Sequence, residues 1–217
     1  MISERLHINE IFYSIQGEST HAGRPCVFVR LTGCNLRCKW CDTEYAFHEG
    51  RRMSVAEVAE IIHSYRCDLI EVTGGEPLLQ EGVYPLTSSL LESGQTVMIE
   101  TSGASDLGRL DPRIIKIMDL KCPGSGECER NLWSNLEHLT KHDEIKFVVA
   151  DRVDYEWARD AIATRNLAAL VNAILLSPVF EQLEPAVLAA WILEDRLPAR
   201  MQLQMHKQIW GPDARGV

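Results

Sequence analysis

The fold of this 217-residue chain is restricted above all by a regular alternation of short apolar runs with amphipathic stretches. Strands are expected at 26–31, 68–73, 96–100, 114–120, 144–150, 171–176 and 201–204, and helices at 54–65, 86–92, 132–139, 154–165 and 185–195. Apolar strands separated by helices indicate parallel pairing with right-handed crossovers. Six or seven such units are fewer than the eight that close a barrel. We therefore predict an α/β fold, an incomplete parallel β/α barrel.

Local signals support two of the helix starts and the domain organisation. Ser54 is followed three residues later by Glu57, which is the spacing of a capping box, and Pro185 suits the first position of a helix. The chain contains no linker, internal repeat or low-complexity tract. We expect residues 1–217 to form a single domain.

Composition excludes several classes of partner and location. The net charge of −9 leaves no basic surplus to neutralise phosphates, so nucleic acid is not an expected partner. No stretch approaches the ~18 apolar residues of a membrane span, and Met1 to Glu10 lacks the apolar core of a signal peptide. Seven cysteines, an odd number without an export signal, indicate a reducing cytoplasm, where clustered cysteines serve as metal ligands.

Three cysteines, Cys34, Cys38 and Cys41, lie within eight residues directly after the first predicted strand. Soft thiolates select iron–sulfur clusters, zinc or copper(I). A structural zinc site needs four ligands and an electron-transfer cluster needs a fourth cysteine, which no other cysteine supplies at motif spacing. Three thiolates leave one iron of a [4Fe–4S] cluster open to a substrate or cofactor. The alternative, an incidental buried thiol, suits Cys26 and Cys67 instead.

A glycine-rich turn, Gly74-Gly75-Glu76-Pro77, follows the second predicted strand. Its two glycines let the backbone approach a ligand, and Glu76 can support either a nearby ammonium or the loop itself. Taken alone, a tight turn explains this segment equally well. Because the carboxyl ends of parallel strands meet at one edge, we expect this turn to lie beside the cysteine loop.

The cysteine spacing, with Trp40 before the third cysteine, and the glycine turn resemble the radical S-adenosylmethionine superfamily. A longer block, running from Ile11-Phe-Tyr-Ser-Ile-Gln-Gly-Glu18 through Phe28-Val-Arg30-Leu-Thr-Gly-Cys34 to Cys41-Asp-Thr43, is similar to the 7-carboxy-7-deazaguanine synthase family. This resemblance covers nearly the whole chain. It implies a carbon–nitrogen lyase that converts 6-carboxy-5,6,7,8-tetrahydropterin to 7-carboxy-7-deazaguanine with loss of ammonia, for queuosine and related 7-deazapurines.

The resemblance also implies the cofactors and partners. A [4Fe–4S] cluster would cleave S-adenosylmethionine reductively, and the resulting 5′-deoxyadenosyl radical would take hydrogen from the pterin and later recover it. Family members also use Mg²⁺. The implied partners are the small pterin substrate, an electron donor such as flavodoxin or ferredoxin, and a second copy of the chain in a homodimer.

The family's motifs assign roles to individual positions of this chain. The cluster ligands match Cys34, Cys38 and Cys41, and the Mg²⁺ ligand matches Thr43. The substrate-binding positions match Ile15, Gln16, Gly17, Arg30, Thr73 and Val217. The cofactor-binding positions match Trp40, Cys41, Asp42, Gly75, Glu76, Asp119, Leu120, Lys121, Ser177, Pro178, Val179 and Phe180. Glu18 and His206 match catalytic positions, and Glu100 is a supporting candidate.

The chemistry of these side chains suits the implied roles. The amide of Gln16 offers donors and an acceptor to a pyrimidinone edge, and the guanidinium of Arg30 can pair a substrate carboxylate, unless it serves as an ordinary salt-bridge partner. The Thr43 hydroxyl is a weak oxygen ligand, which suffices where substrate and water complete the octahedron. In some family members the terminal carboxylate reaches the active site. Here either Val217 takes that part or the role shifts.

Two other functions compete with this hypothesis. An activase would abstract hydrogen from a glycine of a partner protein, but the segment from Gln16 to Glu18, Thr43 and the lack of a second cysteine cluster weigh against it. A non-enzymatic module would hold zinc or an iron–sulfur cluster for structure or redox sensing.

Overall fold

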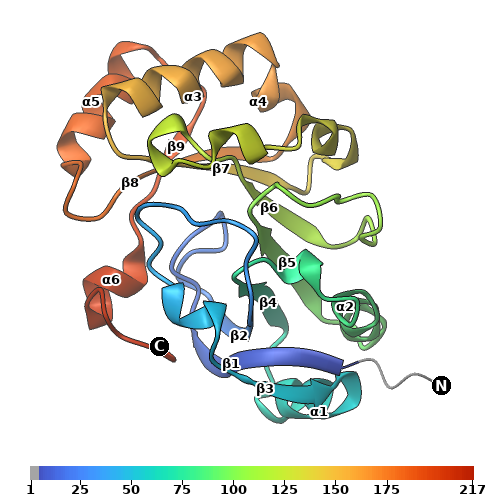
Figure 1. Cartoon of the computed structure of the whole chain (residues 1–217). Helices are drawn as coiled ribbons and strands as arrows, with labels where there is room; N and C mark the ends of the chain where they lie inside the picture. Colours follow the sequence, from blue (N-terminus) through green and yellow to red (C-terminus); the bar gives the residue numbers. More distant parts are fainter. Residues whose placement is uncertain (1–4) are drawn as a thin grey trace.

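The computed structural model describes residues 5–217 and has one nine-stranded sheet at its centre (Figure 1). The strands are β1 (Arg5–Ile15), β2 (Pro25–Leu31), β3 (Arg51–Ser54), β4 (Leu69–Gly74), β5 (Thr96–Thr101), β6 (Ile115–Asp119), β7 (Glu144–Val149), β8 (Ala173–Pro178) and β9 (Arg200–Met201). Their order in the sheet is β3-β1-β2-β4-β5-β6-β7-β8-β9. Because residues 1–4 lie outside the described part, a single domain over 1–217 stays a prediction.

The expected incomplete parallel barrel is confirmed. Neighbouring strands from β2 through β4 to β9 all pair in parallel. The two further strands, β1 and β3, are antiparallel and were not predicted. In β1 polar and apolar residues mix and most are only half-buried, so it lacks a continuous apolar run, while β3 has only four residues and begins with two arginines.

The helices are α1 (Val55–Ser64), α2 (Val83–Glu92), α3 (Arg152–Thr164), α4 (Leu167–Leu170), α5 (Pro185–Glu194) and α6 (Met205–Trp210). Short 3₁₀ helices are η1 (Glu44–Phe47), η2 (Pro77–Leu79), η3 (Pro123–Ser125), η4 (Cys128–Arg130) and η5 (Trp133–His138). The capping box of Ser54 and Glu57 and the helix start at Pro185 are confirmed. The helix expected at 132–139 is 3₁₀, and the strand expected at 201–204 ends at Met201.

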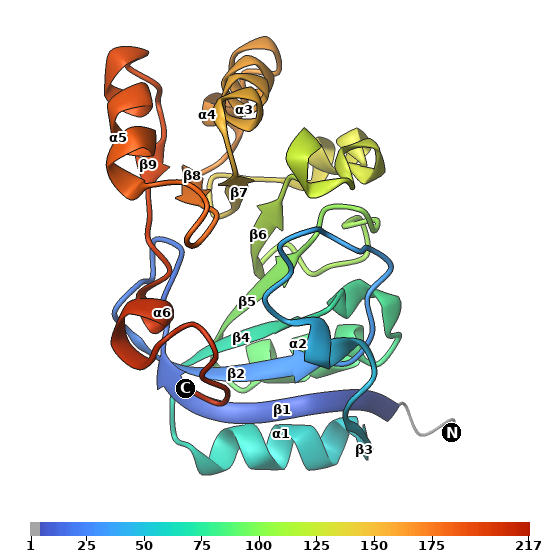
Figure 2. The same cartoon turned by 60° about the vertical axis from the view of Figure 1, so that its left-hand side comes forward.

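The core lies between the outer face of the sheet and helices α1 to α5, which cover it (Figure 2). Its strand residues, such as Val29, Val72 and Ile99, follow one another across neighbouring strands, so they form a continuous apolar layer. Helix residues such as Ile62 and Leu90 pack against this layer. Burial of alternate strand residues on this side leaves the other alternate residues for the concave face.

The concave face is enclosed by segments from both ends of the chain. The loop after β2, α6 and the C-terminal residues lie on this side of the curved sheet (Figure 2). Because β1 runs antiparallel to β2, the loop 16–24 between them lies at the N-terminal end of β2, opposite the end from which the cysteine loop leaves. There the backbone N–H of Thr20 donates to Glu144, which is fully buried, at 3.1 Å.

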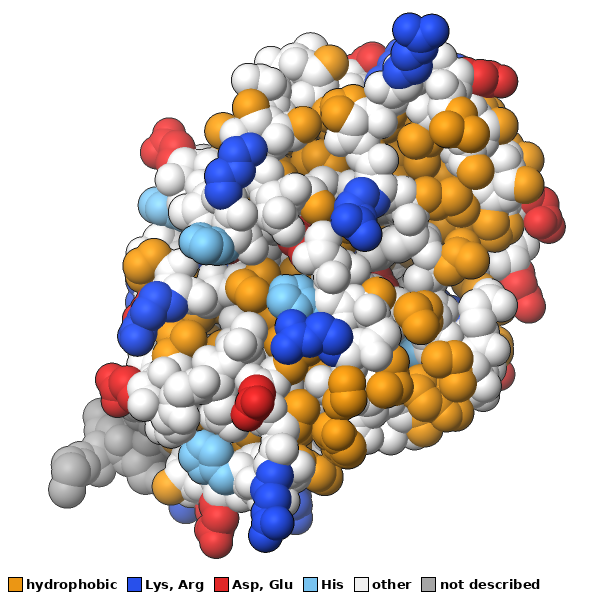
Figure 3. All heavy atoms as spheres, turned by 180° about the vertical axis from the view of Figure 1, so that it is seen from behind, with side chains coloured by type: hydrophobic (Ala, Val, Ile, Leu, Met, Phe, Trp, Pro, Cys, Tyr) orange, Lys and Arg blue, Asp and Glu red, His pale blue; other side chains and the backbone are white. Residues whose placement is uncertain are grey.

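Two surface features complete the description. Large exposed hydrophobic side chains occur near the C-terminus: Val187 and Leu193 on α5, Leu203, and Ile209 and Trp210 on α6. Viewed from behind, hydrophobic side chains gather along the right-hand edge, the side on which α5 and α6 lie (Figure 3). No helix within residues 5–217 has the length and apolar character needed to cross a membrane.

Candidate active site

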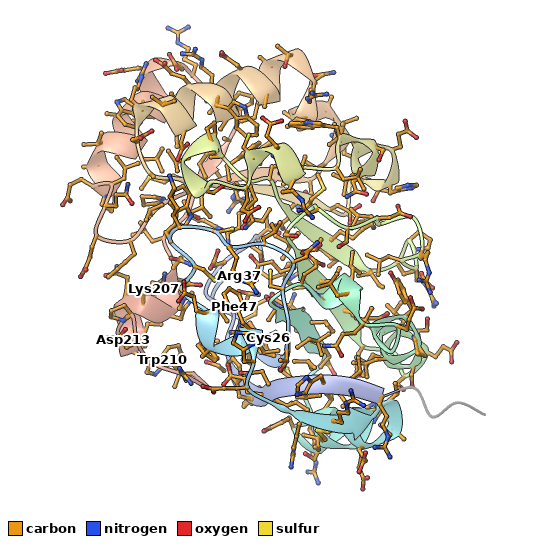
Figure 4. All side chains as sticks on the ribbon, viewed as in Figure 1. Cys26, Arg37, Phe47, Lys207, Trp210 and Asp213 are labelled. Carbon is orange, nitrogen blue, oxygen red and sulfur yellow. The ribbon has the colours of Figure 1, made fainter. Side chains whose placement is uncertain are left out.

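The concave face holds a cavity of about 690 Å³. Strands β1, β2, β4, β5, β6 and β7 line its floor and wall, and the cysteine loop, α6 and residues 212–217 line its rim. Lys207 of α6 and Asp213 of the C-terminal segment lie at this rim, beside the loop that carries Arg37 (Figure 4). The sequence-predicted residues that line the cavity are Ile15, Gln16, Gly17, Glu18, Arg30, Cys34, Cys38, Trp40, Cys41, Asp42, Thr43, Thr73, Gly75, Glu100, Asp119, Lys121, Val179, Phe180, His206 and Val217. Glu76, Leu120, Ser177 and Pro178 lie behind it.

The three cysteines of the loop are free, partly exposed and directed to the cavity. Hydrogen bonds hold the loop at Gly33 N–H to Ala46 O (2.8 Å) and at Lys39 N–H to Ser125 O (3.0 Å). Burial raises the pKa of all three thiols, that of Cys38 to about 11. Metal ligation must therefore release protons from these thiols.

The donor chemistry of the thiols fits an iron–sulfur cluster, in which each thiolate binds a different iron. Cys34, Cys38 and Cys41 supply three soft donors at one cavity, which is the donor set of a [4Fe–4S] cluster with an open iron.

The glycine turn packs directly against the cysteine loop. Gly75 N–H donates to Leu31 O at 3.2 Å, and Glu76 N–H donates to Gly33 O at 2.8 Å. The fully buried Glu76 carboxylate accepts from the N–H groups of Leu78 (3.0 Å) and Ser102 (2.8 Å) and from the Thr101 hydroxyl. Of the two roles left open for Glu76, the contacts correspond to support of the loop.

The two later cofactor segments each contribute part of their length to the cavity. Asp119 and Lys121 face it and pair at 2.8 Å. Burial would lower the pKa of Lys121, but the charges of Asp119 and Cys38 raise it. Asp119 Oδ1 is buried without a hydrogen-bond partner in the described structure, so it is open to a donor from a ligand. Leu120 packs into the core behind the sheet, and of the segment 177–180 only its second half lines the cavity.

A polar wall also lines the cavity. Lys146 Nζ lies 2.5 Å from Glu18 and 2.8 Å from Glu100, and Gln204 donates to Glu18 at 3.0 Å. Burial alone would raise the pKa of Glu18, but the charge and hydrogen bond of Lys146 lower it. Burial raises the pKa of Glu100, and the Glu18 charge adds to this effect against the pull of Lys146.

Gln16 meets this wall differently from the sequence-based expectation. Its amide nitrogen donates to Glu71, and its amide oxygen accepts from the Glu18 N–H at 2.8 Å, so donor and acceptor are already engaged within the protein. Burial and the neighbouring charges of Glu100 and Glu18 raise the pKa of Glu71 well above its usual value. Glu71 therefore holds its proton more tightly than a free glutamate does, where it lines the cavity beside Gln16.

A cationic group surrounds Tyr45 at the end of the cavity near the C-terminus. Arg30 pairs with Glu10 at 2.8 Å, and the Tyr45 hydroxyl donates to the same carboxylate at 2.8 Å. The guanidinium of Arg215 lies 3.8 Å from the centre of the Tyr45 ring, and that of Arg30 lies 5.9 Å from it. Arg30 thus has the salt bridge named as its alternative role and also lines the cavity, as does Val217.

Asp42 and Thr43 lie where the cysteine loop meets α6. The Thr43 hydroxyl donates to Asp42 at 2.9 Å, and Lys207 pairs with Asp42 at 2.7 Å. Burial would raise the pKa of Asp42, but the charge of Lys207 holds it well below its usual range. His206 packs against Gly17. Burial lowers the pKa of His206 and so favours its neutral imidazole form.

Several cavity residues were missed by the sequence analysis, chiefly Glu71, Lys146, Gln204, Lys207 and Arg215. A signal was available for the first two. Each is an ionisable residue inside a mostly apolar predicted strand, and the even spacing of Glu71 with Thr73 indicates a shared inner face. For the other three no strand pattern exists, because they follow β9 in short helical and irregular segments.

Comparisons with known proteins agree on one family. Residues 28–120 match the radical SAM superfamily. The chain is 47% identical to the 7-carboxy-7-deazaguanine synthase of Koribacter versatilis, over 98% of this chain and all of that protein, and 48% identical to that of Chlorobaculum tepidum, over 98% and 97%. The crystal structure of QueE from Escherichia coli superposes with a TM-score of 0.74 at 25% identity, covering 92% of this chain and 94% of that one.

Proposed function

This chain belongs to the 7-carboxy-7-deazaguanine synthase family of radical S-adenosylmethionine enzymes, and on that premise we propose that it converts 6-carboxy-5,6,7,8-tetrahydropterin to 7-carboxy-7-deazaguanine with loss of ammonia. The observation that carries the proposal is that one cavity joins three cluster-type cysteines to a polar wall built from Glu18, Glu100 and Lys146. The enzyme is a carbon–nitrogen lyase of 7-deazapurine biosynthesis, such as that leading to queuosine.

Cys34, Cys38 and Cys41 would hold the [4Fe–4S] cluster, which together with S-adenosylmethionine supplies hydrogen-atom abstraction when bound. Asp119, with its unpartnered Oδ1, and the backbone of Gly75 lie on the same side of the cavity as the cysteines. They are suited to bind the hydroxyl and ammonium donors of S-adenosylmethionine.

The remaining residues suit a charged pterin. Arg30 and Arg215 flank Tyr45; each pairs with a glutamate of the protein, and their remaining N–H donors suit a substrate carboxylate. Glu18 and Glu100 present acceptors to the ring N–H groups, and Thr73 lies beside Glu100 at 3.5 Å. The neutral imidazole of His206 can accept a proton from the reacting substrate.

Thr43 is the residue proposed to bind Mg²⁺. Its hydroxyl donates to Asp42 and keeps its lone pairs for a cation. One hydroxyl is a weak site by itself, so substrate oxygens and water must supply most of the octahedron. Thr43→Ala should weaken Mg²⁺ stimulation of turnover while the absorbance spectrum of the cluster stays unchanged, and loss of the cluster would contradict this role.

The direct test of the proposed function is anaerobic incubation of reconstituted protein with reductant, S-adenosylmethionine, Mg²⁺ and 6-carboxytetrahydropterin, followed by mass spectrometry. We expect 7-carboxy-7-deazaguanine to form, and Cys34→Ala, which removes a cluster ligand, to abolish it. If 5′-deoxyadenosine alone forms slowly, the pterin is not the substrate. The activase alternative would then predict radical transfer to a partner protein, which the full-length family relationship disfavours.

The molecular context is part of the proposal. We propose that residues 1–217 act as one domain, since one sheet joins β1 to β9. A homodimer is supported by the exposed hydrophobic side chains of α5 and α6, among them Leu193, Ile209 and Trp210 (Figure 3). Free cysteines throughout the described chain support a cytoplasmic location, with flavodoxin or ferredoxin as electron donor. Light scattering of the purified protein tests the dimer, and a monomer at micromolar concentration would refute it.

A further inference from the structure

Lys146 is a buried cation at the cavity that the assignments above leave without a role of its own. It lies on β7, where it is only 5% exposed, and its side chain points to the concave face. Its strand neighbours Ile145 and Phe147 point the opposite way, into the core. A buried ammonium is costly unless it is paired, so its partners indicate why the fold accepts it.

The partners of Lys146 come from two separate parts of the chain. Glu18 belongs to the loop between β1 and β2, and Glu100 belongs to β5. Their carboxylates lie 2.5 Å and 2.8 Å from Lys146 Nζ. Throughout residues 5–217, no other lysine, arginine or histidine forms an ion pair with either carboxylate. Lys146 therefore joins strand β5 of the barrel wall to the loop 16–24 between β1 and β2.

The charges at this wall are unevenly supplied. Asp42 and Asp119, which also line the cavity, each have a lysine of their own at 2.7 Å and 2.8 Å. Glu18 and Glu100 share a single ammonium. Because both carboxylates contact Lys146, they lie close to each other, and like charges that close repel strongly in a medium of low dielectric constant. The two carboxylates can therefore face the same space only while Lys146 lies between them.

We propose that Lys146 is a positioning residue that holds Glu18 and Glu100 together against one wall of the cavity, so that both face the pterin ring as hydrogen-bond acceptors. This inference rests on the proposed function, because it names the pterin as the group that the two carboxylates contact. Lys146 acts through them: two of its three N–H donors are engaged with these carboxylates, and the substrate meets the acceptors that it has placed.

A second buried pair in the same sheet separates positioning from mere stabilisation. Lys116 of β6 pairs with Asp143 at 3.1 Å, and both side chains are almost fully buried. Neither residue lines the cavity. Lys116→Met therefore removes a buried ammonium from an ion pair as Lys146→Met does, but at a place that the pterin does not reach.

The experiment compares wild type, Lys146→Met, Lys116→Met and the double variant Lys146→Met/Glu100→Gln, all reconstituted with the cluster and loaded with S-adenosylmethionine. Three quantities are measured: the melting temperature, the dissociation constant for 6-carboxypterin by fluorescence titration, and kcat/KM for 6-carboxytetrahydropterin. Truncating one partner of a buried, hydrogen-bonded charge pair at a binding site costs a factor of about 30 or more, so we expect Lys146→Met to lose about 30-fold in pterin affinity and in kcat/KM.

Lys116→Met should lose thermal stability but keep pterin affinity and turnover within about twofold of wild type. The double variant, in which one of the two repelling carboxylates is gone, should regain thermal stability without regaining pterin affinity, and it decides the matter if Lys146→Met does not fold. The inference is overturned if Lys146→Met binds and turns over the pterin like wild type, if Lys116→Met loses pterin affinity equally, or if the double variant recovers both stability and pterin affinity. If the wild type forms no product, the proposed function is refuted. In that case the binding titration still tests the positioning role, which is refuted if wild type and Lys146→Met bind 6-carboxypterin equally.

Discussion

Replacing Gly75 by alanine would push the cysteine loop away from the glycine turn. A Cβ at residue 75 would lie 2.6 Å from the carbonyl carbon of Gly33 and 2.7 Å from Cβ of Cys34, whereas ordinary contact begins at 3.4 Å. The carbonyl oxygen of Gly33 would lie nearer still, so the loop must move by about 1 Å. It cannot do so freely, because Glu76 N–H donates to Gly33 O at 2.8 Å. The displacement therefore reaches a ligand of the cluster.

The expected losses differ for stability and for activity. Overpacking of this kind costs about 1–3 kcal/mol of unfolding free energy, which lowers the melting temperature of a chain of this size by about 2–12 °C. Misplacement of a reacting group by about 1 Å costs about 10²-fold in rate. We therefore expect Gly75→Ala to fold and to lose about 100-fold in kcat/KM for 6-carboxytetrahydropterin, together with part of its iron.

The assay combines iron and sulfide content after anaerobic reconstitution, the melting temperature and single-turnover product formation. Gly94→Ala is the control, since Gly94 has φ of +84° at the end of α2 and nothing within 4 Å of an added Cβ. It should lose about 1–2 kcal/mol from backbone strain alone and keep its iron and turnover. A Gly75→Ala enzyme with full iron content and wild-type turnover would refute the close-packing argument.

Three further predictions concern single side chains. Glu76→Gln replaces a carboxylate oxygen by an NH2 donor that faces a backbone N–H, such as that of Ser102, which lies 2.8 Å from the carboxylate in the wild type. Urea unfolding should therefore show a loss of about 2 kcal/mol in the free energy of unfolding, and unchanged stability would contradict the supporting role. The folded protein holds a proton on Glu71 more tightly than the unfolded chain does, so stability of the wild type is lost as pH rises above about 4.5, the usual pKa of this carboxyl group. In urea titrations from pH 4 to 7, the free energy of unfolding of the wild type relative to that of Glu71→Gln should fall by up to about 1.4 kcal/mol per pH unit, and parallel pH curves would refute this. Arg215→Ala removes a guanidinium that lines the cavity 3.8 Å from Tyr45. Loss of a charge-assisted hydrogen bond to the substrate carboxylate, worth about 1.5–3 kcal/mol, should raise the dissociation constant for 6-carboxypterin at least about 10-fold in fluorescence titrations without loss of iron, and unchanged affinity would exclude Arg215 from the site.

Much of this molecule follows from local patterns in the sequence. The parallel strands were predicted because each is a short apolar run, and the start of α1 because Ser54 and Glu57 form a capping box within four residues. Cys34, Cys38 and Cys41 were recognised because ligands from one loop have a fixed spacing. Such features depend on neighbours in the chain, so the sequence alone determines them.

The tertiary structure decided what depends on distant neighbours. Strand β1 exists because it pairs with β2 and β3, although its own pattern of residues is weak. The ion pairs of Lys146 join residues 128 and 46 positions apart; the charge of Lys146 lowers the pKa of Glu18, whereas burial raises the pKa of Glu71. From the sequence, the Glu76 carboxylate could bind either a ligand ammonium or the protein itself. In the structure it accepts hydrogen bonds from Thr101 and Ser102, so it binds the protein. Coulomb energy and desolvation depend on distance and burial in space, which spacing along the chain does not specify.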